Sequence, residues 1–354
     1  MSTGSQFSLV LGGGGLKGLA HVGVFRGLEE RGLVPAVVVG CSIGSLIAAA
    51  WASGMSVREM EDRALAIKRQ DVFRVAHLDM ALKRMLSPAV YRREPLEQLI
   101  HSIVGDRTFE DLPHRLIVNT VDLNTGIQIP WGLPGLTKVR VADAVFASCA
   151  LPGILAPRPI DGRVCVDGAV AENLPIRSAL AASSGPIVAV DVGGSGGRRH
   201  AIERQGFALT YARGLEIVMS TLTEELLREW RDPPILLVRP RVERISMFSF
   251  NRTPYLIAEG FRALNAALDR LPGDLAALPS GVHPQREVVL AVDPKACIRC
   301  GICIAREPDV FAWGPDGRAT AKASRQSWSQ LGDRVVRSCP TGAISAVQLW
   351  PPID

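Results

Sequence analysis

Apolar residues in the first part of this 354-residue chain follow two alternating patterns. The short, continuous apolar runs at 7–11 and 36–39 are rich in β-branched side chains, which is typical of buried strands. The segments 17–31 and 42–53 instead carry apolar residues at helical spacing, and each is followed by a glycine that can end a helix. These patterns predict strand, helix, strand and helix in succession.

The same alternation continues through the next two hundred residues. Ser56 and Glu59 form a capping-box pattern that opens another helix, and residues 254–270 predict the last helix of this region. Further buried strands are expected at 116–121, 163–166, 187–192 and 235–238. Strands that alternate with helices predict a three-layer α/β/α fold around a mainly parallel central sheet.

The composition of the sequence changes near residue 280. Residues 271–285 are rich in proline, glycine and alanine, as in a linker, and short strands and a cysteine run follow. We therefore expect a large domain over 1–275, a linker over 276–286 and a small α+β domain over 287–354.

Composition narrows the function classes. Hydrophobic residues make up 47% and charged residues 21%, as in globular proteins, and the net charge of +5 comes without the basic stripe of a nucleic-acid binder. This charge permits weak attraction to an anionic membrane surface. Neither a spanning apolar segment nor a signal-peptide pattern is found, so we expect a cytoplasmic protein with peripheral contact to the inner membrane face and with reduced or metal-bound cysteines.

The pentapeptide Gly40-Cys41-Ser42-Ile43-Gly44 lies between an expected strand and an expected helix. Gly-x-Ser-x-Gly in that context is the nucleophile-elbow pattern, in which a strained turn holds the serine at a helix N-terminus. A small turn of glycine and serine gives the same five-residue pattern, so the pattern alone is weak evidence for a nucleophile. For Cys41 a buried filler is favoured over a competing thiol.

A glycine-rich loop, residues 12–15, precedes the elbow and also joins a strand to a helix. Its spacing satisfies G-x-G-x-x-G, which leaves a nucleotide site open, but Lys17 is not followed by the serine or threonine of a P-loop. The second strand also lacks the acidic residue that a ribose would require. Beside a serine elbow, such a loop is better explained as an oxyanion hole of backbone N–H groups.

Asp167 follows the strand at 163–166 and is the expected general base for Ser42. Asp-Gly pairs are more often simple turns. A Ser-His-Asp triad would need a later histidine, and only His200 and His283 follow, in an expected loop and in the linker. A Ser-Asp dyad is therefore favoured, and His21, on an apolar helix, is expected to be a packed histidine.

These three motifs in this order resemble the patatin-like phospholipase family over residues 7–270. The segments 18–21, 147–153 and 172–175 also resemble its bacterial members. The resemblance implies that Ser42 is the nucleophile and Asp167 its partner. It implies an oxyanion hole built from the backbone amides of four residues, Gly13, Gly14, Gly15 and Leu16. The implied substrate is a fatty acyl ester or a phospholipid.

Four of the seven cysteines lie in the last sixty residues. They are Cys297, Cys300, Cys303 and Cys339, the last followed by Pro340. Three cysteines at this spacing plus a distant Cys-Pro are typical of one [4Fe–4S] cluster. Zinc is the main alternative, although structural zinc sites usually use two separated pairs.

The tail resembles single-cluster bacterial ferredoxins over residues 287–350, including the segments 307–311 and 339–344. That resemblance implies a redox partner protein. From Arg286 onward nine lysines and arginines and seven acidic residues give 9 − 7 = +2, whereas many ferredoxins are acidic. Docking to a basic partner is therefore not indicated.

Two function classes follow from these motifs. The first is a serine acyl-ester hydrolase with an appended iron–sulfur domain for electron transfer or redox control. The second is an iron–sulfur electron-transfer or redox-sensing protein in which the patatin-like domain is a scaffold, a regulated output or an acyltransferase. Ester hydrolysis consumes no electrons, so the sequence gives no chemical reason for the fusion.

Overall fold

The computed structural model describes all of the chain except residues 1–5, 73, 75–88, 195–205, 272 and 350–354. Two compact units are found: one runs to Leu226 and resumes over Arg231–Gly281, and the other consists of Leu227–Trp230 with the chain from Val282 onward. Within the described residues no helix combines the length and the hydropathy needed to cross a membrane.

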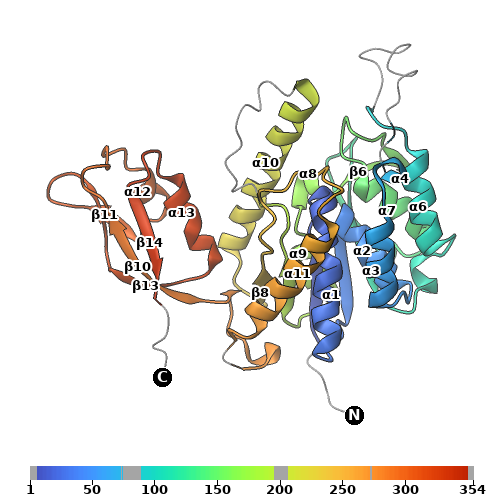
Figure 1. Ribbon diagram of the computed structural model, residues 1–354, viewed down its shortest axis with the longest axis horizontal. Coiled ribbons are helices and arrows are strands. Elements are labelled where there is room, and N and C mark those ends of the chain that lie inside the picture. The colour runs from blue at the N-terminus through green and yellow to red at the C-terminus, as the bar shows by residue number, and fades with distance from the viewer. Residues whose placement is uncertain (1–5, 73, 75–88, 195–205, 272, 350–354) are drawn as a thin grey trace. The chain divides into compact units, whose positions relative to one another are not determined.

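The first unit alternates strands and helices along the chain (Figure 1). Its strands are β1 (Ser8–Leu11), β2 (Val37–Cys41), β3 (Leu116–Asp122), β4 (Gln128–Trp131), β5 (Arg158–Ile160), β6 (Arg163–Asp167), β7 (Ile187–Val190) and β8 (Ile235–Val238). Its helices are α1 (Ala20–Glu30), α2 (Ile43–Ala52), α3 (Val57–Ala66), α4 (Arg69–Val72), α6 (Glu94–Val104), α7 (Val141–Cys149), α8 (Ala169–Glu172), α9 (Ile176–Ala182), α10 (Phe207–Glu229) and α11 (Thr253–Leu268). Short 3-10 turns lie at Gly15–Leu19, Phe109–Asp111 and Leu275–Ala277.

The central sheet has the strand order β5-β6-β3-β2-β1-β7-β8, with β4 paired to β3. The strands β3, β2, β1, β7 and β8 run parallel, whereas β4, β5 and β6 add antiparallel pairs at one side. The expected mixed α/β fold with a mainly parallel sheet and helices on both faces is confirmed. The capping box of Ser56 and Glu59 is present at the start of α3.

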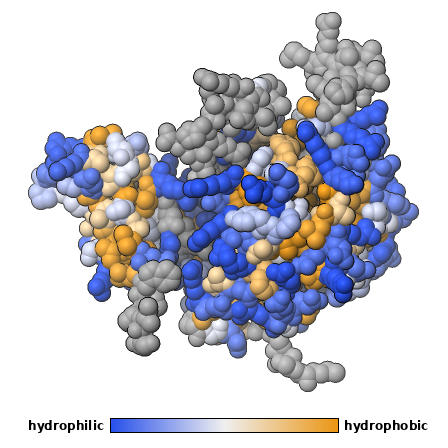
Figure 2. Space-filling view, in the orientation of Figure 1, coloured by the Kyte–Doolittle hydropathy of each residue, from blue (hydrophilic) through white to orange (hydrophobic). Residues whose placement is uncertain are grey.

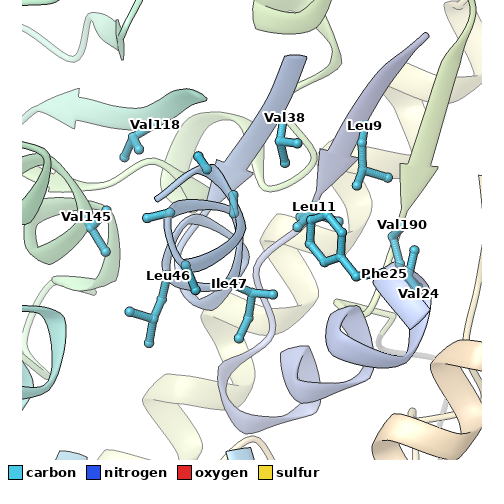
Figure 3. Close-up of a cluster of buried hydrophobic side chains, with 14 of the residues drawn as sticks. Leu9, Leu11, Val24, Phe25, Val38, Leu46, Ile47, Val118, Val145 and Val190 are labelled. Atoms are coloured by element: carbon cyan, nitrogen blue, oxygen red, sulfur yellow. The ribbon is translucent and has the colours of Figure 1, made fainter. Parts of the chain in front are cut away.

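Both faces of this sheet are buried, and side chains alternate between them. Leu9, Val38 and Val118 join a core with residues of α1, α2 and α7, and Figure 3 shows this cluster. The opposite face is packed by α9, which contacts β1, β2, β3 and β7. Two buried faces explain why the strands read as continuous apolar runs rather than as alternating ones.

Helices α1 and α11 cross with their backbones in direct contact. A Cβ on Gly23 would lie 1.8 Å from the Ile257 carbonyl oxygen, and a Cβ on Gly260 would lie 1.8 Å from the Ala20 oxygen. No side chain fits at either position. These two glycines therefore set the distance between the helices.

The segment expected to be a linker carries structure. Leu275 and Leu278 are buried and pack on the core of the first unit. A short strand, β9 (Val282–His283), begins the second unit. Burial of its apolar side chains thus holds this proline- and glycine-rich stretch in place.

A cavity of about 390 Å³ lies between α2, α3, α4 and α6, away from the sheet. Its walls include Leu46, Met60 and Leu99, and Arg63 and Arg74 also border it. In Figure 2 apolar side chains gather over the region of α2.

The second unit contains a three-stranded antiparallel sheet in the order β13-β10-β14 and a two-stranded pair, β11-β12. The strands are β10 (Arg286–Val292), β11 (Phe311–Trp313), β12 (Ala319–Ala321), β13 (Arg325–Trp328) and β14 (Ile344–Gln348). Two short helices, α12 (Ile302–Arg306) and α13 (Asp333–Ser338), and a 3-10 turn at Gln330–Gly332 complete it. This is the small α+β unit that the sequence predicts.

Candidate active site

Ser42 occupies a strained turn between β2 and α2. Its backbone angles are φ 54° and ψ −131°, a combination that residues with a side chain rarely adopt. The flanking glycines permit the turn, because a Cβ on Gly44 would lie 2.2 Å from the Leu11 carbonyl oxygen and a Cβ on Gly40 would lie 2.4 Å from the Ser45 Cα. The turn therefore has the geometry of a nucleophile elbow.

The backbone of Ser42 is held by a buried serine on α7. The Ser42 N–H donates to the Ser148 Oγ at 2.9 Å, and this hydroxyl donates to the Asn119 carbonyl oxygen at 2.7 Å. Ser148 lies in the motif at 147–153, but its role becomes visible only when α7 is placed beside the elbow. It is a positioning residue that sequence reasoning did not identify.

Strand β3 brings Asp167 to the elbow. Asn119 pairs with Cys41 at the end of β2, and the next residue, Thr120, pairs with Asp167 at the end of β6. The Cys41 thiol donates to Asp167 Oδ1 at 3.6 Å, and the Ser42 hydroxyl lies close enough to Asp167 to lower the pKa of its carboxyl group. Two residues 125 positions apart in the chain are thus joined in one site.

Asp167 is almost completely buried, with 2% of its surface exposed. Burial raises the pKa of its carboxyl group to about 6, although hydrogen bonds from the Ala169 N–H, the Ser42 hydroxyl and the Cys41 thiol oppose the shift. A carboxyl group with this pKa is ionised at neutral pH and can still accept a proton. Its electrostatics suit a general base.

The neighbouring cysteine does not compete as a nucleophile. Burial and the adjacent Asp167 carboxylate raise the pKa of the Cys41 thiol well above its ordinary value. Cys41 therefore stays protonated and packs in a small cluster with Ala169 and Met219. This favours the filler role.

Ser42 and Asp167 line one cavity of about 30 Å³. Its other walls are Gly13, Gly14, Gly15, Lys17, Leu151, Ala169, Asn173, Gly193, Glu216, Met219 and Met247. This volume can hold one or two water molecules. The acyl chain of a fatty ester is far larger, so it must extend past the present walls.

Two of the four residues expected in the oxyanion hole use their N–H groups elsewhere. The Gly13 N–H donates to the Asn173 carbonyl oxygen at 3.1 Å, and the Leu16 N–H donates to the Met247 carbonyl oxygen at 2.9 Å. No backbone acceptor is recorded among the described residues for the N–H groups of Gly14 and Gly15. The loop itself lies beside the nucleophile, since a Cβ on Gly13 would be 3.0 Å from the Ser42 Cβ.

A buried ion pair forms one wall of the cavity. The Lys17 ammonium, with no exposed surface, lies 3.2 Å from Glu216 Oε1, and Arg213 lies 2.8 Å from the other carboxylate oxygen of Glu216. Lys17 lies on the 3-10 turn that follows the glycine-rich loop, whereas Glu216 is on α10. The pair therefore ties this helix to that turn, a contact across 199 positions that the sequence does not show.

The histidines do not complete a triad within the described residues. His21 is buried, its Nε2 lies 2.8 Å from the Gly12 carbonyl oxygen, and burial lowers its pKa to about 4, so it is a packed histidine as expected. His200 lies outside the described residues. His283 is buried on β9, and neither His21 nor His283 lines the cavity.

The cysteine tail lies in the second unit. Cys303 is part of the small core of this unit, and Cys297 and Cys339 pack against that core, whereas Cys300 is exposed. Positive φ angles at Arg299 and Gly301, 62° and 72°, turn the chain sharply between these cysteines. Among the described residues no three side chains of ligand type lie close enough to bind a single ion. A four-iron cube, by contrast, attaches each thiolate to a different iron.

Cys339 has the environment of a thiolate ligand. Its burial opposes ionisation, but hydrogen bonds from Thr341 and from the N–H groups of Ala343 and Ile344 hold its pKa below the ordinary value. The Ala343 N–H lies 3.3 Å from the sulfur. Such N–H donors are a usual surrounding of cluster-bound sulfur. The donor set therefore fits an iron–sulfur cluster.

Two family descriptions match the chain. Residues 9–180 match the patatin-like phospholipase family, and residues 292–346 match the 4Fe-4S single cluster domain of ferredoxin I. The chain joins a patatin-like domain to a ferredoxin-like domain. Both resemblances stated from the motifs are confirmed, and the four cysteines fall inside the second match. We call the two compact units the patatin-like unit and the ferredoxin-like unit.

Curated relatives resemble the patatin-like unit. An uncharacterized NTE family protein of Mycobacterium tuberculosis is 28% identical over 292 residues, covering 76% of this chain and 47% of that protein. Patatin-like phospholipase domain-containing protein 6 of Mus musculus is 33% identical over 196 residues, covering 54% of this chain and 14% of that protein. The chain thus spans about half the length of the first of these relatives.

Solved structures with a similar chain course include two bacterial proteins. VipD from Legionella pneumophila aligns with a TM-score of 0.42 and 16% identity, covering 75% of this chain and 67% of VipD. The type III effector protein ExoU aligns with a TM-score of 0.41 and 17% identity, covering 75% of this chain and 53% of ExoU.

Proposed function

We propose that the patatin-like unit hydrolyses fatty acyl esters, with phospholipids or lysophospholipids as the substrate class. The observation that carries this proposal is the shared cavity of Ser42 and Asp167, in which a strained serine lies beside a buried carboxylate and a glycine-rich loop. The family match supports the lipid substrate, which the cavity alone does not identify.

Each step uses residues of this cavity. The Ser42 Oγ attacks the ester carbonyl carbon while Asp167 accepts the hydroxyl proton, and the tetrahedral intermediate then collapses to an acyl-serine. The departing alcohol takes the proton back from Asp167. Water next attacks the acyl-serine, again losing its proton to Asp167, and the fatty acid leaves as Ser42 regains its hydrogen.

The oxyanion of each intermediate needs backbone donors. We assign this role to the N–H groups of Gly14 and Gly15, because those of Gly13 and Leu16 already donate to carbonyl oxygens. Removal of one such donor commonly costs two to three orders of magnitude in rate, roughly 100- to 1,000-fold. In this assignment Gly13 and Leu16 shape the loop rather than contact the oxyanion.

We further propose that Cys297, Cys300, Cys303 and Cys339 hold one [4Fe–4S] cluster in the ferredoxin-like unit. A bound cluster would supply one-electron chemistry, which suits exchange with a redox partner protein. The thiolate environment of Cys339 and the family match over 292–346 support this assignment.

A second candidate function follows from the ferredoxin-like unit. The chain would then be an electron-transfer or redox-sensing protein, and its patatin-like unit would be a scaffold, a regulated output or an acyltransferase. Ester-hydrolysis rates measured with the cluster oxidised and reduced separate the candidates. A large difference favours redox control of the hydrolase, and equal rates contradict such control.

The decisive experiment compares wild-type protein and Ser42→Ala, both purified anaerobically, on a panel of acyl esters and phospholipids. Ser102→Ala, which changes an exposed serine on α6, is the matched control. We expect hydrolysis by the wild type and the control and none above background by Ser42→Ala. Unchanged hydrolysis in Ser42→Ala would overturn the assignment of the nucleophile.

A further inference from the structure

Helix α10 has one face in the active-site cavity and another in solvent. Glu216 and Met219 line the cavity of Ser42, whereas Ile217 and Val218, between them in sequence, are 47% and 53% exposed. Only the width of this helix therefore separates the cavity of Ser42 from solvent. Whatever contacts the outer face of α10 lies one helix diameter from the cavity.

The outer face of α10 carries no charge over three turns. From Thr210 to Leu222 its exposed residues are Thr210, Tyr211, Gly214, Ile217, Val218, Thr221 and Leu222. The two charged residues in this stretch, Arg213 and Glu216, point inward and pair with each other, with 17% and 5% of their side chains exposed. Solvent-facing sides of helices are normally rich in charge, so this apolar face indicates a partner.

The loop opposite α10 has the complementary character. Residues 239–252 supply Met247 to the wall of the cavity, and they contain four arginines and one glutamate, which gives 4 − 1 = +3. Arg241, Arg244 and Arg252 are exposed. An apolar face and a basic loop thus border the same small cavity.

We propose that α10 and the 239–252 loop dock the protein on an anionic lipid surface. The uncharged face of α10 enters the apolar boundary of the lipid layer, and the three exposed arginines contact headgroup phosphates. This arrangement presents Ser42 to the surface in which acyl esters reside. The proposal rests on the proposed function, because docking brings Ser42 to a lipid substrate. Lipid binding itself is measured separately from hydrolysis.

The cavity gives the docking a consequence for access. At about 30 Å³ it excludes an acyl chain, and Glu216, Met219 and Met247 from the two docking elements form part of its wall. Lipid docked on these two elements therefore lies beside the walls that an acyl chain must pass. Docking and substrate entry then occur at one place.

The test measures co-sedimentation of the full chain with vesicles of phosphatidylcholine and with vesicles of equal parts phosphatidylcholine and phosphatidylglycerol. The variant Val218→Glu with Leu222→Glu charges the outer face of α10. Val34→Glu, at a position that is 67% exposed on the α1–β2 connection, is the matched control. A third variant replaces Arg241, Arg244 and Arg252 by glutamine.

Wild type and Val34→Glu should prefer the anionic vesicles. The double glutamate variant should lose affinity for them by roughly tenfold or more, since both apolar side chains are withdrawn from the lipid. The triple glutamine variant should lose the preference for phosphatidylglycerol, and added salt should have the same effect on wild type.

Hydrolysis of a soluble short-chain ester is the second readout. All of these variants should retain the wild-type rate, which shows that they are folded, and Val218→Ser with Leu222→Ser replaces the glutamate pair if that pair does not fold. Wild-type vesicle affinity in both α10 variants overturns the proposal. A change from dimer to monomer in these variants, with unchanged vesicle affinity, assigns the face to a second copy of the chain and also overturns it. Absence of ester hydrolysis in wild type contradicts the proposed function but not the lipid docking.

Discussion

At the scale of single residues, the site depends on one carboxyl group that is held in an unfavourable environment. Burial raises the pKa of Asp167 to about 6, and the hydrogen bonds from Ser42, Cys41 and Ala169 offset only part of that cost. The group is thus less acidic than an exposed aspartate and a stronger base once it is ionised. Burial therefore causes both the basicity of the Asp167 carboxylate and its unfavourable contribution to the free energy of folding.

The pH dependence of hydrolysis follows from this pKa. Asp167 can accept a proton only when it is ionised, so kcat/KM on a soluble ester should rise about tenfold per pH unit below about 6 and level off above it. A stopped assay between acidic and neutral pH measures the profile. A plateau that extends well below pH 5 would show that another group is the base.

The stability of the fold should carry the opposite pH signature. The folded pKa of Asp167 lies above the unfolded value, so its protonated form stabilises the fold at low pH, and this contribution is lost as pH rises through about 6. Asp167→Asn should therefore be inactive and yet more stable than wild type at pH 8, by about 2–3 kcal/mol. Urea unfolding at pH 8 and near pH 4 tests this, and the gain should vanish at the lower pH.

Asp122→Asn provides the matched control on β3. Hydrogen bonds from the Thr125 hydroxyl and from backbone N–H groups, against the effect of burial, hold the pKa of Asp122 below its ordinary value. Its ionised form is therefore favoured in the folded state, and the asparagine variant should be less stable than wild type at pH 8. Equal behaviour of the two variants would contradict the electrostatic explanation.

At the scale of elements, backbone contacts determine how the helices pack. The crossing of α1 and α11 requires glycine at positions 23 and 260, since each would place a Cβ 1.8 Å from a carbonyl oxygen. Separation of the two helices would also open the core around Phe25. Local sequence shows two ordinary helices with interior glycines, and only the fold explains why alanine is absent there.

Gly260→Ala should destabilise the patatin-like unit strongly, by about 3 kcal/mol or more, because an overpacked contact must be relieved by shifting a helix. Gly214→Ala on α10 is the control, since a Cβ there meets nothing within 4 Å. That substitution should stabilise the protein by about 0.5–1 kcal/mol through helix propensity. Thermal unfolding compares them, and similar melting temperatures would refute the role of Gly260.

The sequence indicates some of the residues that line the cavity of Ser42 and not others, for a physical reason. Ser42 and Asp167 lie in local motifs at the ends of strands, and the neighbouring residues in the sequence indicate the turns that hold them. Ser148, Glu216 and the N–H groups that remain for an oxyanion depend on contacts between distant segments. Likewise, the burial of Leu278 within a linker-like composition depends on the core it meets. Neither the composition nor the motif spacing of the sequence predicts such contacts.

At the scale of the whole molecule, two units with unlike chemistry share one chain. The patatin-like unit has a deep core around a parallel sheet, whereas the ferredoxin-like unit has a small core to which three of its four tail cysteines contribute. A small unit of this kind would gain much of its stability from the proposed cluster. Loss of the cluster should therefore affect the second unit far more than the first.

Cys339→Ser tests the cluster assignment in the full chain. The anaerobically purified variant should lose the brown colour and the visible absorbance that bleaches on reduction, while hydrolysis of a soluble ester stays within about twofold of wild type. Cys165→Ala, which changes a buried cysteine on β6, should keep the absorbance. A colourless wild-type protein that contains zinc would refute the cluster.

The contact between Gly44 and the Leu11 carbonyl has an evolutionary consequence. Because backbone meets backbone there, the aim of the serine is independent of which apolar side chains fill the surrounding core. Sequences can therefore drift widely through the sheet and its covering helices while the reactive hydroxyl keeps its place. A turn built in this way can keep its shape while the side chains around it change.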